Sequence, residues 1–328
     1  MAQSKPGLKP NPSSEWPEPF VAAAVQAPPS IGDLATGVDR AVDHIRSAAK
    51  EGARLIVFPE TWLPGYPYFH GYPRDPGFRD LYDSLFVNSV TVPGPQIDRI
   101  AAAAKRAKAT VVIGVNERDE QGGTLYNTLV YIGANGKLLG KHRKLVPTLS
   151  ERLIWGRGDG SDLDVYDSDV GRLGGLICYE HQMAPARYAL AGLGAQIHAS
   201  VWPGYDFLHP IVDAATRHLS YENACFVVVA REVMSPDRLP PGTPLAEEPI
   251  WDMHGGSAII APGGKYLAGP VFDEETTVYA EIDLRSTIES KRWVDSVGHY
   301  ARPDVFQLQW DKSPKQPLLI HDGSGASA

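Results

Sequence analysis

The sequence predicts an α/β fold in which a mixed sheet carries helices on its outside. Apolar runs typical of strands alternate with segments of helical periodicity through the first two thirds of the 328 residues, and hairpin-like strands follow in the last third. A hydrophobic content of 43% is ample for a large core. No internal repeat and no convincing domain boundary interrupts the pattern, so we expect one structural domain.

The first elements follow from local patterns. Residues 21–27 are almost all apolar and predict a strand. A helix is predicted over residues 34–50, because apolar residues recur there at helical spacing: Leu34, Val38, Ala41, Val42 and Ile45. Residues 55–58 predict a short strand. The stretch 62–76 is rich in aromatic residues and proline and has no period, which predicts a long loop of the kind that often carries function.

The remaining elements continue the alternation. Asn135-Gly136 is a hairpin signal between two strand-like runs. Further helices are predicted over residues 95–108, 183–193 and 211–223. Further strands are predicted over residues 110–115, 125–132, 137–139, 170–177, 193–201, 225–230, 257–260, 265–267 and 278–282.

Three chemically capable side chains stand at the ends of apolar runs. Glu60 lies just past a short apolar run, where a parallel strand would deliver it to the sheet edge. Lys144 belongs to a basic cluster that leads into an apolar pair and a proline. Cys178 lies between a glycine-rich strand and a helix, on a turn where helix amides can favour a thiolate. Together they supply a base, a cation and a nucleophile.

Each of these residues also has an ordinary interpretation when it is taken alone. An isolated Glu or Lys is usually a solvated surface charge. A free Cys is usually a small buried hydrophobe, which is how we interpret Cys225 inside its apolar strand pattern. His181 follows the candidate nucleophile by three residues, whereas a Cys-His pair normally meets across the fold, so we expect a wall or hydrogen-bonding role for it.

Six segments, all in order, carry a resemblance to a known family. They are FPETWLPGYPY at 58–68, HRKLVPT at 142–148, ERLIWGRGDG at 151–160, CYEH at 178–181, HGGSAII at 254–260 and GHYARPDVF at 298–306. This set resembles the nitrilase branch of the nitrilase (carbon-nitrogen hydrolase) superfamily, and the resemblance runs from about residue 20 to about residue 306. At Tyr179 the family more often has Trp, so substrate choice is where we expect this chain to differ.

The resemblance implies an α-β-β-α sandwich, in which two mixed sheets pack face to face with helices outside. It implies a catalytic triad of Glu60, Lys144 and Cys178, with Glu151 as a second glutamate that positions Lys144 or water. From its sequence position alone, Glu151 is also compatible with a cap on a surface helix. The resemblance further implies a homodimer or larger homo-oligomer, which is built partly from the helix over residues 183–193.

Aromatic residues near these segments are candidate walls of a substrate pocket. Tyr66 follows Glu60 in the predicted loop, Tyr179 follows the nucleophile, and Trp202 ends a predicted strand where ligands of parallel sheets bind. Each of them taken alone is more often an ordinary aromatic core residue, and only together do they indicate an apolar pocket. The ten histidines show no recognisable metal-ligand spacing, so neither a metal nor a cofactor is expected.

The expected activity is that of a nitrilase, which converts an organic nitrile to the carboxylic acid and ammonia through a cysteine thioimidate and thioester. The same triad would also serve an amidase, or an enzyme that hydrates cyanide or a nitrile. An assembly protein without catalytic activity is the alternative from another class. An intact set of Glu, Lys and Cys favours the enzyme.

Composition limits the classes of binding partner and the cellular compartment that we expect for this protein. A net charge of -8 and the lack of a phosphate loop or basic stripe argue against nucleic-acid binding. Two cysteines in 328 residues and no secretory leader predict a cytoplasmic protein, and no apolar run is long enough for a membrane span. We expect a flexible extension over residues 1–19, a single hydrolase domain over 20–310 and a flexible tail over 311–328.

Overall fold

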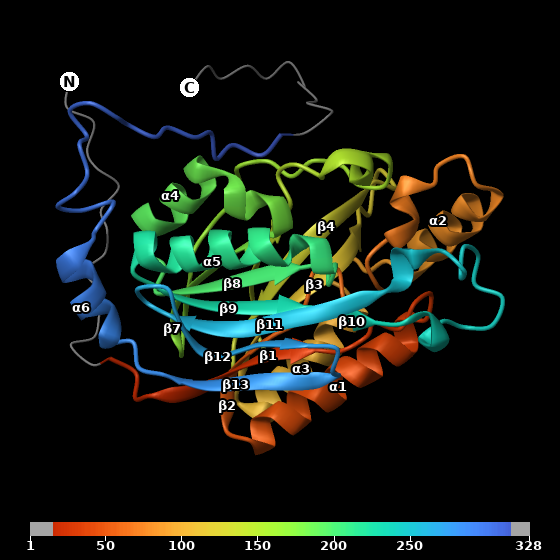
Figure 1. Cartoon of the computed structure of the whole chain (residues 1–328), viewed down its shortest axis with the longest axis horizontal. Helices are drawn as coiled ribbons and strands as arrows, with labels where there is room; N and C mark the ends of the chain where they lie inside the picture. Colours follow the sequence, from red (N-terminus) through yellow and green to blue (C-terminus); the bar gives the residue numbers. More distant parts are fainter. Residues whose placement is uncertain (1–15, 316–328) are drawn as a thin grey trace, which may run out of the picture.

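The computed structural model describes residues 16–315, and in them two mixed sheets pack face to face between two layers of helices (Figure 1). The predicted α-β-β-α sandwich is therefore confirmed. The expected extension falls largely on residues 1–15 and the expected tail largely on residues 316–328, which lie outside the described residues. The three-part domain division stays a prediction.

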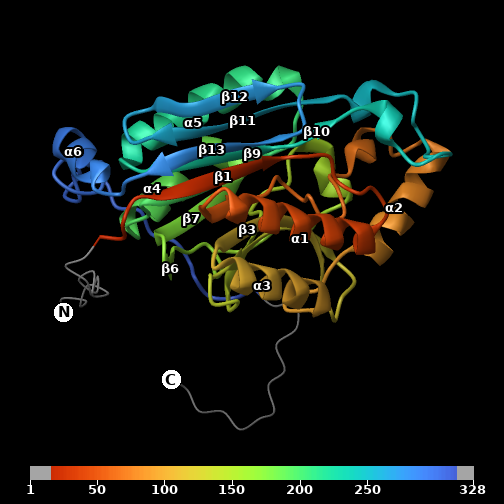
Figure 2. The ribbon, with the colours of Figure 1, turned by 90° about the horizontal axis from the view of Figure 1, so that it is seen from below.

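The first sheet has six strands in the order β13-β1-β2-β3-β4-β5, in which β1, β2 and β3 run parallel and the other pairs antiparallel. Helices α1 (Leu34–Lys50) and α3 (Pro95–Ala107) lie side by side on its outer face (Figure 2). The strands are β1 (Phe20–Gln26), β2 (Ala53–Val57), β3 (Thr110–Arg118), β4 (Leu125–Ile132), β5 (Leu138–Arg143) and β13 (Thr276–Ile282).

The second sheet has seven strands in the order β10-β11-β9-β8-β7-β6, with β12 also paired to β11. Strands β7, β8 and β9 run parallel, and helices α4 (Ala184–Gly192) and α5 (His209–Asn223) cover the outer face (Figure 1). The strands are β6 (Tyr166–Ser168), β7 (Gly171–Ile177), β8 (Ile197–Trp202), β9 (Phe226–Arg231), β10 (Val233–Met234), β11 (Met253–Ala261) and β12 (Lys265–Phe272).

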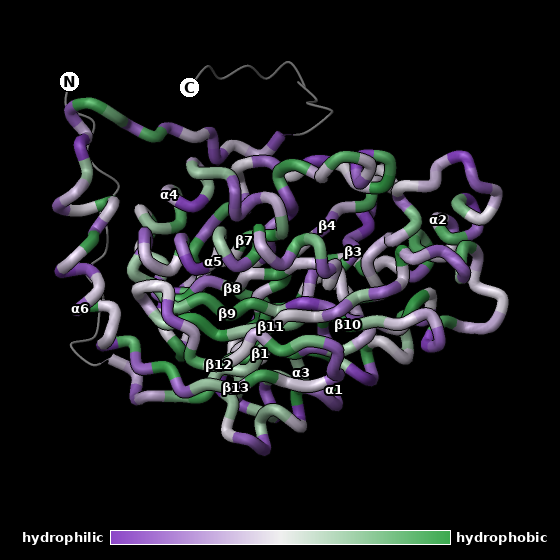
Figure 3. Tube along the Cα trace, in the orientation of Figure 1, coloured by the Kyte–Doolittle hydropathy of each residue, from purple (hydrophilic) through white to green (hydrophobic). Residues whose placement is uncertain are grey.

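The largest apolar cluster lies between the two sheets. It joins buried residues of β1, β2 and β4, such as Ala24, Leu55 and Leu129, to residues of the second sheet such as Val201 and Val228. Apolar residues gather along these central strands, while the outer helices alternate in hydropathy (Figure 3). Strands with an apolar side chain on both faces are typical of parallel strands buried between layers, and this burial fixes how the two sheets face each other.

Helix α1 shows how the sequence pattern determines an element. Asp33 caps its first turn, because the carboxylate accepts a hydrogen bond from the Thr36 amide. The predicted apolar stripe is buried, including Val38, Ala41 and Ile45. The helix spans Leu34–Lys50, which are the residues predicted from the periodicity.

Two helices were not predicted from the sequence. Helix α2 (Pro76–Asn88) buries only Leu81 and Leu85, so its periodicity is weak. Its start nevertheless carries a recognisable signal, because Asp75 accepts from the Gly77 amide and Pro76 occupies the first turn. Helix α6 (Ser286–Trp293) buries only Thr287, and an apolar stripe is therefore missing from its sequence.

The chain after α6 returns to the body of the protein. The Lys315 amide donates to the Asp159 carboxylate at 2.7 Å, and the Lys312 ammonium pairs with Asp164 at 2.9 Å. Among residues 16–315, no helix combines the length and the apolar character that crossing a membrane requires.

Candidate active site

The three residues singled out at the ends of apolar runs meet at one end of the sandwich. Glu60 follows β2, Lys144 follows β5, and Cys178 directly follows β7. The carboxylates of Glu60 and Glu151 and the sulfur of Cys178 each offer an atom within 4.8 Å of the others. Residues from both sheets, far apart in the chain, thus form one buried cluster.

Backbone geometry holds Glu60 in position. Thr61, the next residue, has a positive φ of 44°, which turns the chain sharply after the strand. The neighbouring strand β3 approaches so closely that a Cβ on Gly114 would lie 2.2 Å from the Pro59 carbonyl oxygen. A glycine is therefore needed at position 114 for the Glu60 segment to pack against β3.

Lys144 lies between two carboxylates. Its ammonium is 3.0 Å from Glu60 Oε1 and 2.8 Å from Glu151 Oε2. Asn127 Nδ2 also donates to Glu60 Oε1 at 2.6 Å, and Glu60 Oε2 has no hydrogen-bond partner among the described residues. One oxygen of Glu60 is thus held in place while the other is free to exchange a proton.

Glu151 is fully inside this cluster. It lies on a short 3-10 turn, Leu149–Leu153, where it accepts from the Thr148 amide at 2.6 Å. It caps that turn, as its sequence position allowed, but it is buried rather than on the surface. Its other oxygen accepts from the Tyr66 hydroxyl at 2.5 Å.

Cys178 has an unusual backbone conformation. Its φ is 49°, in the left-handed region that a residue with a Cβ rarely adopts, and only 6% of the residue is exposed. Strained conformations of this kind recur at functional turns. Burial raises the pKa of the thiol, while the charge of Lys144 and the Tyr179 amide, within the 3-10 turn Cys178–Gln182, act to lower it.

Glu180 joins the cysteine segment to the lysine segment. Its carboxylate accepts from the amides of Ile177 and Leu145, each at 2.8 Å, and pairs with His142 at 3.0 Å. Burial would lower the pKa of His142, but the Glu180 and Asp162 carboxylates outweigh it and raise that pKa to about 10. A buried, fully paired Glu180 therefore fixes the residues beside Cys178 and Lys144 relative to each other.

His181 does not face the thiol as a base. Its Nδ1 is 2.8 Å from the Cys178 carbonyl oxygen, its Nε2 is 3.1 Å from His198, and its ring stacks on Trp202. Burial lowers the pKa of His181 to about 4, so the ring is neutral near neutral pH. Trp202 is itself fully buried and donates to Ser200.

Burial dominates the electrostatics of the cluster. It raises the pKa of Glu60 to about 7, although Lys144 opposes the shift. Burial also raises the pKa of Cys178 well above its usual range. For Lys144 burial acts to lower the pKa, but Glu151 and Glu60 outweigh it, and the ammonium stays charged. The resting site thus holds a neutral thiol, a lysine cation and a glutamate that ionises near neutral pH.

The same atoms could be read as a metal site, since Glu60, Glu151 and Cys178 offer three ligands within 4.8 Å. The lysine argues against that interpretation. Its ammonium is in direct contact with both carboxylates and already supplies the positive charge that a metal ion would bring. The donor set fits an internal ion-pair network better than a bound cation.

The predicted pocket residues lie in different surroundings. Tyr66 is buried against Tyr68, Trp155 and Tyr205, with its hydroxyl on Glu151. Trp202 lies behind His181. The ring of Tyr179 is directed outward, and 38% of this residue is exposed. Of the three, Tyr66 contacts the charged cluster directly.

Asn127 and Glu180 were not identified as site residues from the sequence. Asn127 donates to the Glu60 carboxylate, and Glu180 accepts from the amide of Ile177, next to Cys178. Asn127 did carry a signal, because it and Thr128 are polar residues within a strand that otherwise consists of aliphatic and aromatic residues. The Glu180 contact to Leu145 crosses 35 residues of sequence, and no local pattern indicates it.

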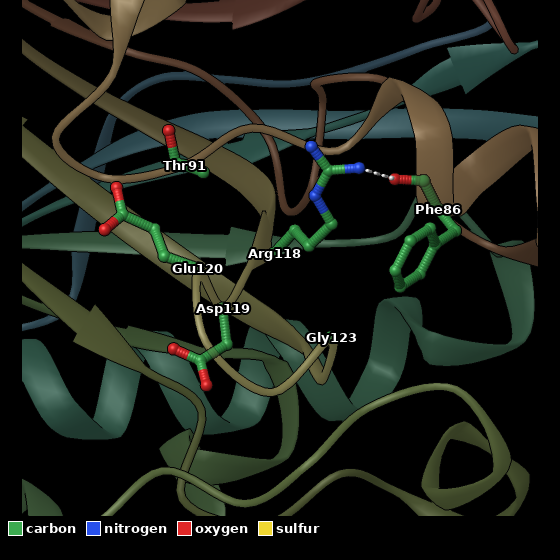
Figure 4. Close-up of a pocket in the computed structure, with 6 residues that line it drawn as sticks. All are labelled: Phe86, Thr91, Arg118, Asp119, Glu120 and Gly123. Carbon is green, nitrogen blue, oxygen red and sulfur yellow. Dashed lines mark hydrogen bonds between the residues drawn. The ribbon is translucent and has the colours of Figure 1, made fainter.

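A surface hollow elsewhere on the molecule is separate from this cluster. It has a volume of about 350 Å³ and lies at the β3–β4 connection, where Arg118 donates to the Phe86 carbonyl oxygen at 3.4 Å (Figure 4). The side chains of Asp119 and Glu120 also line it. None of its lining residues belongs to the Glu-Lys-Cys cluster, so we assign it no part in the chemistry.

Comparisons with known proteins agree with this arrangement. The family model for carbon-nitrogen hydrolases matches residues 21–292. A prokaryotic protein of unknown source named nitrilase 2 is 39% identical over 300 residues, which cover 91% of this chain and 94% of that protein. An aliphatic nitrilase of Rhodococcus rhodochrous is 38% identical over 93% of this chain and 86% of its own length.

Solved structures show the same fold. Nit3 of Saccharomyces cerevisiae, described as a member of branch 10 of the nitrilase superfamily, superposes with a TM-score of 0.70 at 21% identity, over 86% of this chain and 96% of its own. A carbon-nitrogen hydrolase of Helicobacter pylori gives a TM-score of 0.68 at 21% identity, over 84% and 93%. On the family match, the extent of the identities and the shared sandwich, the chain is a member of the carbon-nitrogen hydrolase family.

Proposed function

We propose that the protein is a nitrilase, which hydrolyses an organic nitrile to the carboxylic acid and ammonia. The observation that carries this proposal is the buried cluster in which the Cys178 sulfur lies within 4.8 Å of two carboxylates, both of them bonded to Lys144. The choice of a nitrile rests on the relatives named nitrilase, which are 36–39% identical over most of the chain.

The first half of the reaction forms a covalent intermediate. Glu60 accepts the thiol proton, and the sulfur of Cys178 adds to the nitrile carbon. One bond of the C≡N group opens, and the nitrogen takes up a proton from Glu60 to give a thioimidate. Lys144 and the Tyr179 amide stabilise the negative charge that grows on this nitrogen.

The second half consumes two waters. Glu60 removes a proton from the first water, which adds to the thioimidate carbon, and the nitrogen leaves as ammonia after it is protonated. The resulting thioester is attacked by a second water activated in the same way, which releases the acid and restores the thiol. Every proton is exchanged among the chain's own groups and water, so the sequence of steps requires no cofactor.

Glu151 serves as a positioning residue in this scheme. It bonds to Lys144 at 2.8 Å and is itself held by Tyr66 and by the Thr148 amide. A lysine fixed from two sides presents its charge in one direction, which lowers the reorganisation needed when the nitrogen becomes charged. We propose that Tyr66, Tyr179 and Trp202 bound or support the substrate pocket.

Hydration of the nitrile to its amide is the second candidate. Two relatives, from Lupinus angustifolius and Oryza sativa, are named bifunctional nitrilase/nitrile hydratase and are 36% and 38% identical. The two outcomes diverge at the tetrahedral intermediate, which yields acid when the carbon–nitrogen bond breaks and amide when the carbon–sulfur bond breaks. Amide hydrolysis would use the same groups from that intermediate onward.

The test is product analysis on a panel of aliphatic and arylaliphatic nitriles. We expect ammonia and the matching acid in equal amounts, with any amide quantified by chromatography, and no product from Cys178→Ala. Amides tested as substrates separate an amidase. A pure protein that releases nothing from nitriles, amides or cyanide would contradict the proposal and favour an assembly protein without catalytic activity.

We also propose that the protein works as a homodimer or larger homo-oligomer in the cytoplasm. Helix α4 presents Pro185 and the exposed Tyr188 beside a groove of about 620 Å³, which residues 296–308 line on the other side. An apolar face of this kind favours a second copy as its partner. Light scattering tests this: a fully active monomer of 35.6 kDa at micromolar concentration would refute it.

A further inference from the structure

Glu232 lies at the same sheet edge as the nucleophile, two strands away. Strands β7, β8 and β9 run parallel, with Ile177 opposite Val201 and Val201 opposite Ala230. Cys178 follows the first of these positions by one residue and Glu232 follows the last by two. At about 4.8 Å per strand, their backbones are roughly 10 Å apart. Ligands of parallel sheets bind at this carboxyl edge.

The Glu232 carboxyl is buried without a cation. None of the residue is exposed, and no lysine or arginine among the described residues pairs with it. The neighbouring Arg231 turns instead to the carbonyl oxygens of Pro203 and Tyr205. The Tyr68 hydroxyl donates to Glu232 Oε2, whereas Oε1 has no hydrogen-bond partner in the described part of the chain.

An aromatic wall connects this carboxyl with the catalytic cluster. The ring of Tyr68 lies 5.3 Å from that of Tyr66, whose hydroxyl bonds to Glu151. Tyr205 stands 6.2 Å from Tyr68 and 6.4 Å from Tyr66. Glu60 and Glu151 both pair with Lys144, whereas no ammonium among the described residues pairs with Glu232, which is buried beside these aromatic rings.

The protonation state of Glu232 determines what it can bind. Burial raises the pKa of this carboxyl well above its usual range, and the charge of Glu60 adds to the shift. Such a shift favours the protonated carboxyl, which can donate a hydrogen bond as well as accept one. Because Oε2 is occupied by Tyr68, Oε1 is the oxygen left for a ligand, and a protonated carboxyl can donate from it.

We infer that Glu232 is a specificity-determining residue, which donates a hydrogen bond to an oxygen acceptor of the substrate at the end remote from the reacting nitrile carbon. The inference rests on the proposed nitrilase function and adds the substrate class: nitriles with a hydroxyl, ether or carbonyl oxygen a few atoms from the cyano group. A buried donor left unpaired is unfavourable, so a substrate that lacks the oxygen is discriminated against.

The experiment compares two nitriles of nearly equal size, 4-hydroxybutanenitrile and pentanenitrile, in which a hydroxyl replaces a methyl group. We expect kcat/KM of the wild-type protein to favour the hydroxynitrile by about tenfold or more, the scale of one buried hydrogen bond. Glu232→Gln, which offers an N–H donor at the same place, should keep this ratio. Glu232→Met, of similar size but without a donor, should lower it about tenfold.

Tyr131→Phe is the matched control. The Tyr131 hydroxyl is also buried without a partner in the described residues, but the backbone of Tyr131 lies four residues along β4 from Asn127, about 13 Å at 3.3 Å per residue, and the hydroxyl lies beside Gly175, three residues before Cys178. This variant should leave the ratio unchanged. A falling ratio here would mean that any buried polar loss alters specificity, and would overturn the assignment.

The outcomes separate the two proposals. A wild-type protein that hydrolyses both nitriles without preference overturns the role of Glu232 and leaves the nitrilase proposal standing, and this measurement does not depend on any variant folding. A lower melting temperature of Glu232→Met with an unchanged ratio shows a structural role only and also overturns it. A preference for 4-aminobutanenitrile that Glu232→Gln abolishes would show that an ionised Glu232 pairs with the substrate ammonium. This outcome would overturn its role as a hydrogen-bond donor. Absence of any nitrile hydrolysis overturns both proposals together.

Discussion

Cys178 and Cys225 are both buried, yet they lie at opposite edges of the same sheet, beside its parallel strands β7 and β9. Cys178 follows β7 at the carboxyl end, whereas Cys225 precedes β9 at the amino end. Burial raises the pKa of both thiols, to about 12 for Cys225. Both also lie at a left-handed backbone position. Cys178 itself has a φ of 49°, and Ala224, the residue before Cys225, has the same value.

The surroundings of the two thiols differ, and this difference decides their chemistry. Cys225 belongs to the apolar core between the sheets, and burial there is what raises the pKa of its thiol. Cys178 faces Lys144 and two carboxylates at the edge where strands deliver their last side chains. Burial alone makes a thiol inert, whereas in the proposed mechanism a base and a cation buried beside Cys178 deprotonate it during the reaction.

The largest expected effect tests the contrast directly. Cys178→Ala should lower turnover by roughly 10⁴-fold or more, because no other group can form the covalent intermediate. Cys225→Ala, equally buried but at the amino end, should stay within a few-fold of the wild type. Steady-state ammonia release measures both. Comparable turnover in pure Cys178→Ala would remove the distinction between the two ends.

A smaller effect is expected from the cation. Lys144→Ala should reduce kcat by about 10² to 10³, the range for loss of one oxyanion-type donor. Lys144→Arg should not restore it, because a planar guanidinium cannot replace a compact ammonium between two carboxylates. The matched control is Lys141→Ala, three residues earlier on β5, whose ammonium pairs with Glu117 at 2.5 Å. Equal losses in Lys144→Ala and Lys141→Ala would show that general electrostatics, not position, matters.

The pH dependence sharpens the role of Glu60. Its pKa is raised to about 7, chiefly by burial, and only the ionised form can accept the thiol proton. We expect kcat/KM to fall toward a slope of about tenfold per pH unit below 7, and to reach about one thirtieth of its high-pH plateau at pH 5.5. Melting temperature over the same range separates this from unfolding, and a flat profile between pH 7 and 5.5 would contradict the assignment.

Glu60 also makes the free energy of unfolding depend on pH, and the direction of this dependence is opposite to that of an ordinary salt-bridged carboxylate. Between pH 4.5 and 7 the folded protein binds the Glu60 proton while the unfolded chain, with a pKa near 4.5, has lost it. The contribution of this one group is thus present below pH 4.5 and is lost as the pH rises through 7. Glu60→Gln should flatten this part of the stability profile.

The smallest effect concerns the residue that supports the cluster from outside. Tyr66→Phe removes the 2.5 Å hydrogen bond to Glu151 and leaves the aromatic wall in place. We expect a loss of about tenfold in kcat, the scale of one hydrogen bond to a charged group. Tyr131→Phe again serves as control. An unchanged kcat would mean that Glu151 is held sufficiently by Lys144 and the Thr148 amide.

The sequence predicted those parts of the structure that depend on local patterns. Glu60 and Cys178 were identifiable because each follows an apolar run that predicts a strand. A residue just past the end of a strand lies at the edge of the sheet. The resemblance to a family added Glu151 and the second sheet. The periodicity of α1 located that helix, while α2 lacked an apolar stripe strong enough to be recognised.

The unpredicted parts depend on contacts between distant segments. Asn127 and Glu60 are 67 residues apart, and His142 and Glu180 are 38 apart. Glu232 directly follows a predicted strand and resembles any polar residue that ends one. Only the tertiary structure shows that it is buried without a cation, since burial and partner both come from other strands and loops.

The two-sheet origin of the site has a consequence for how the protein matures. Glu60 and Lys144 extend from the first sheet and Cys178 from the second, so the three meet only when the sheets have docked. Neither half contains a complete reactive centre while the chain is being synthesised or refolded. Because such distant contacts form late, recovered turnover should lag behind the recovery of helical circular dichroism. Enzyme activity thereby reports the closing of the interface between the sheets rather than the formation of the sheets themselves.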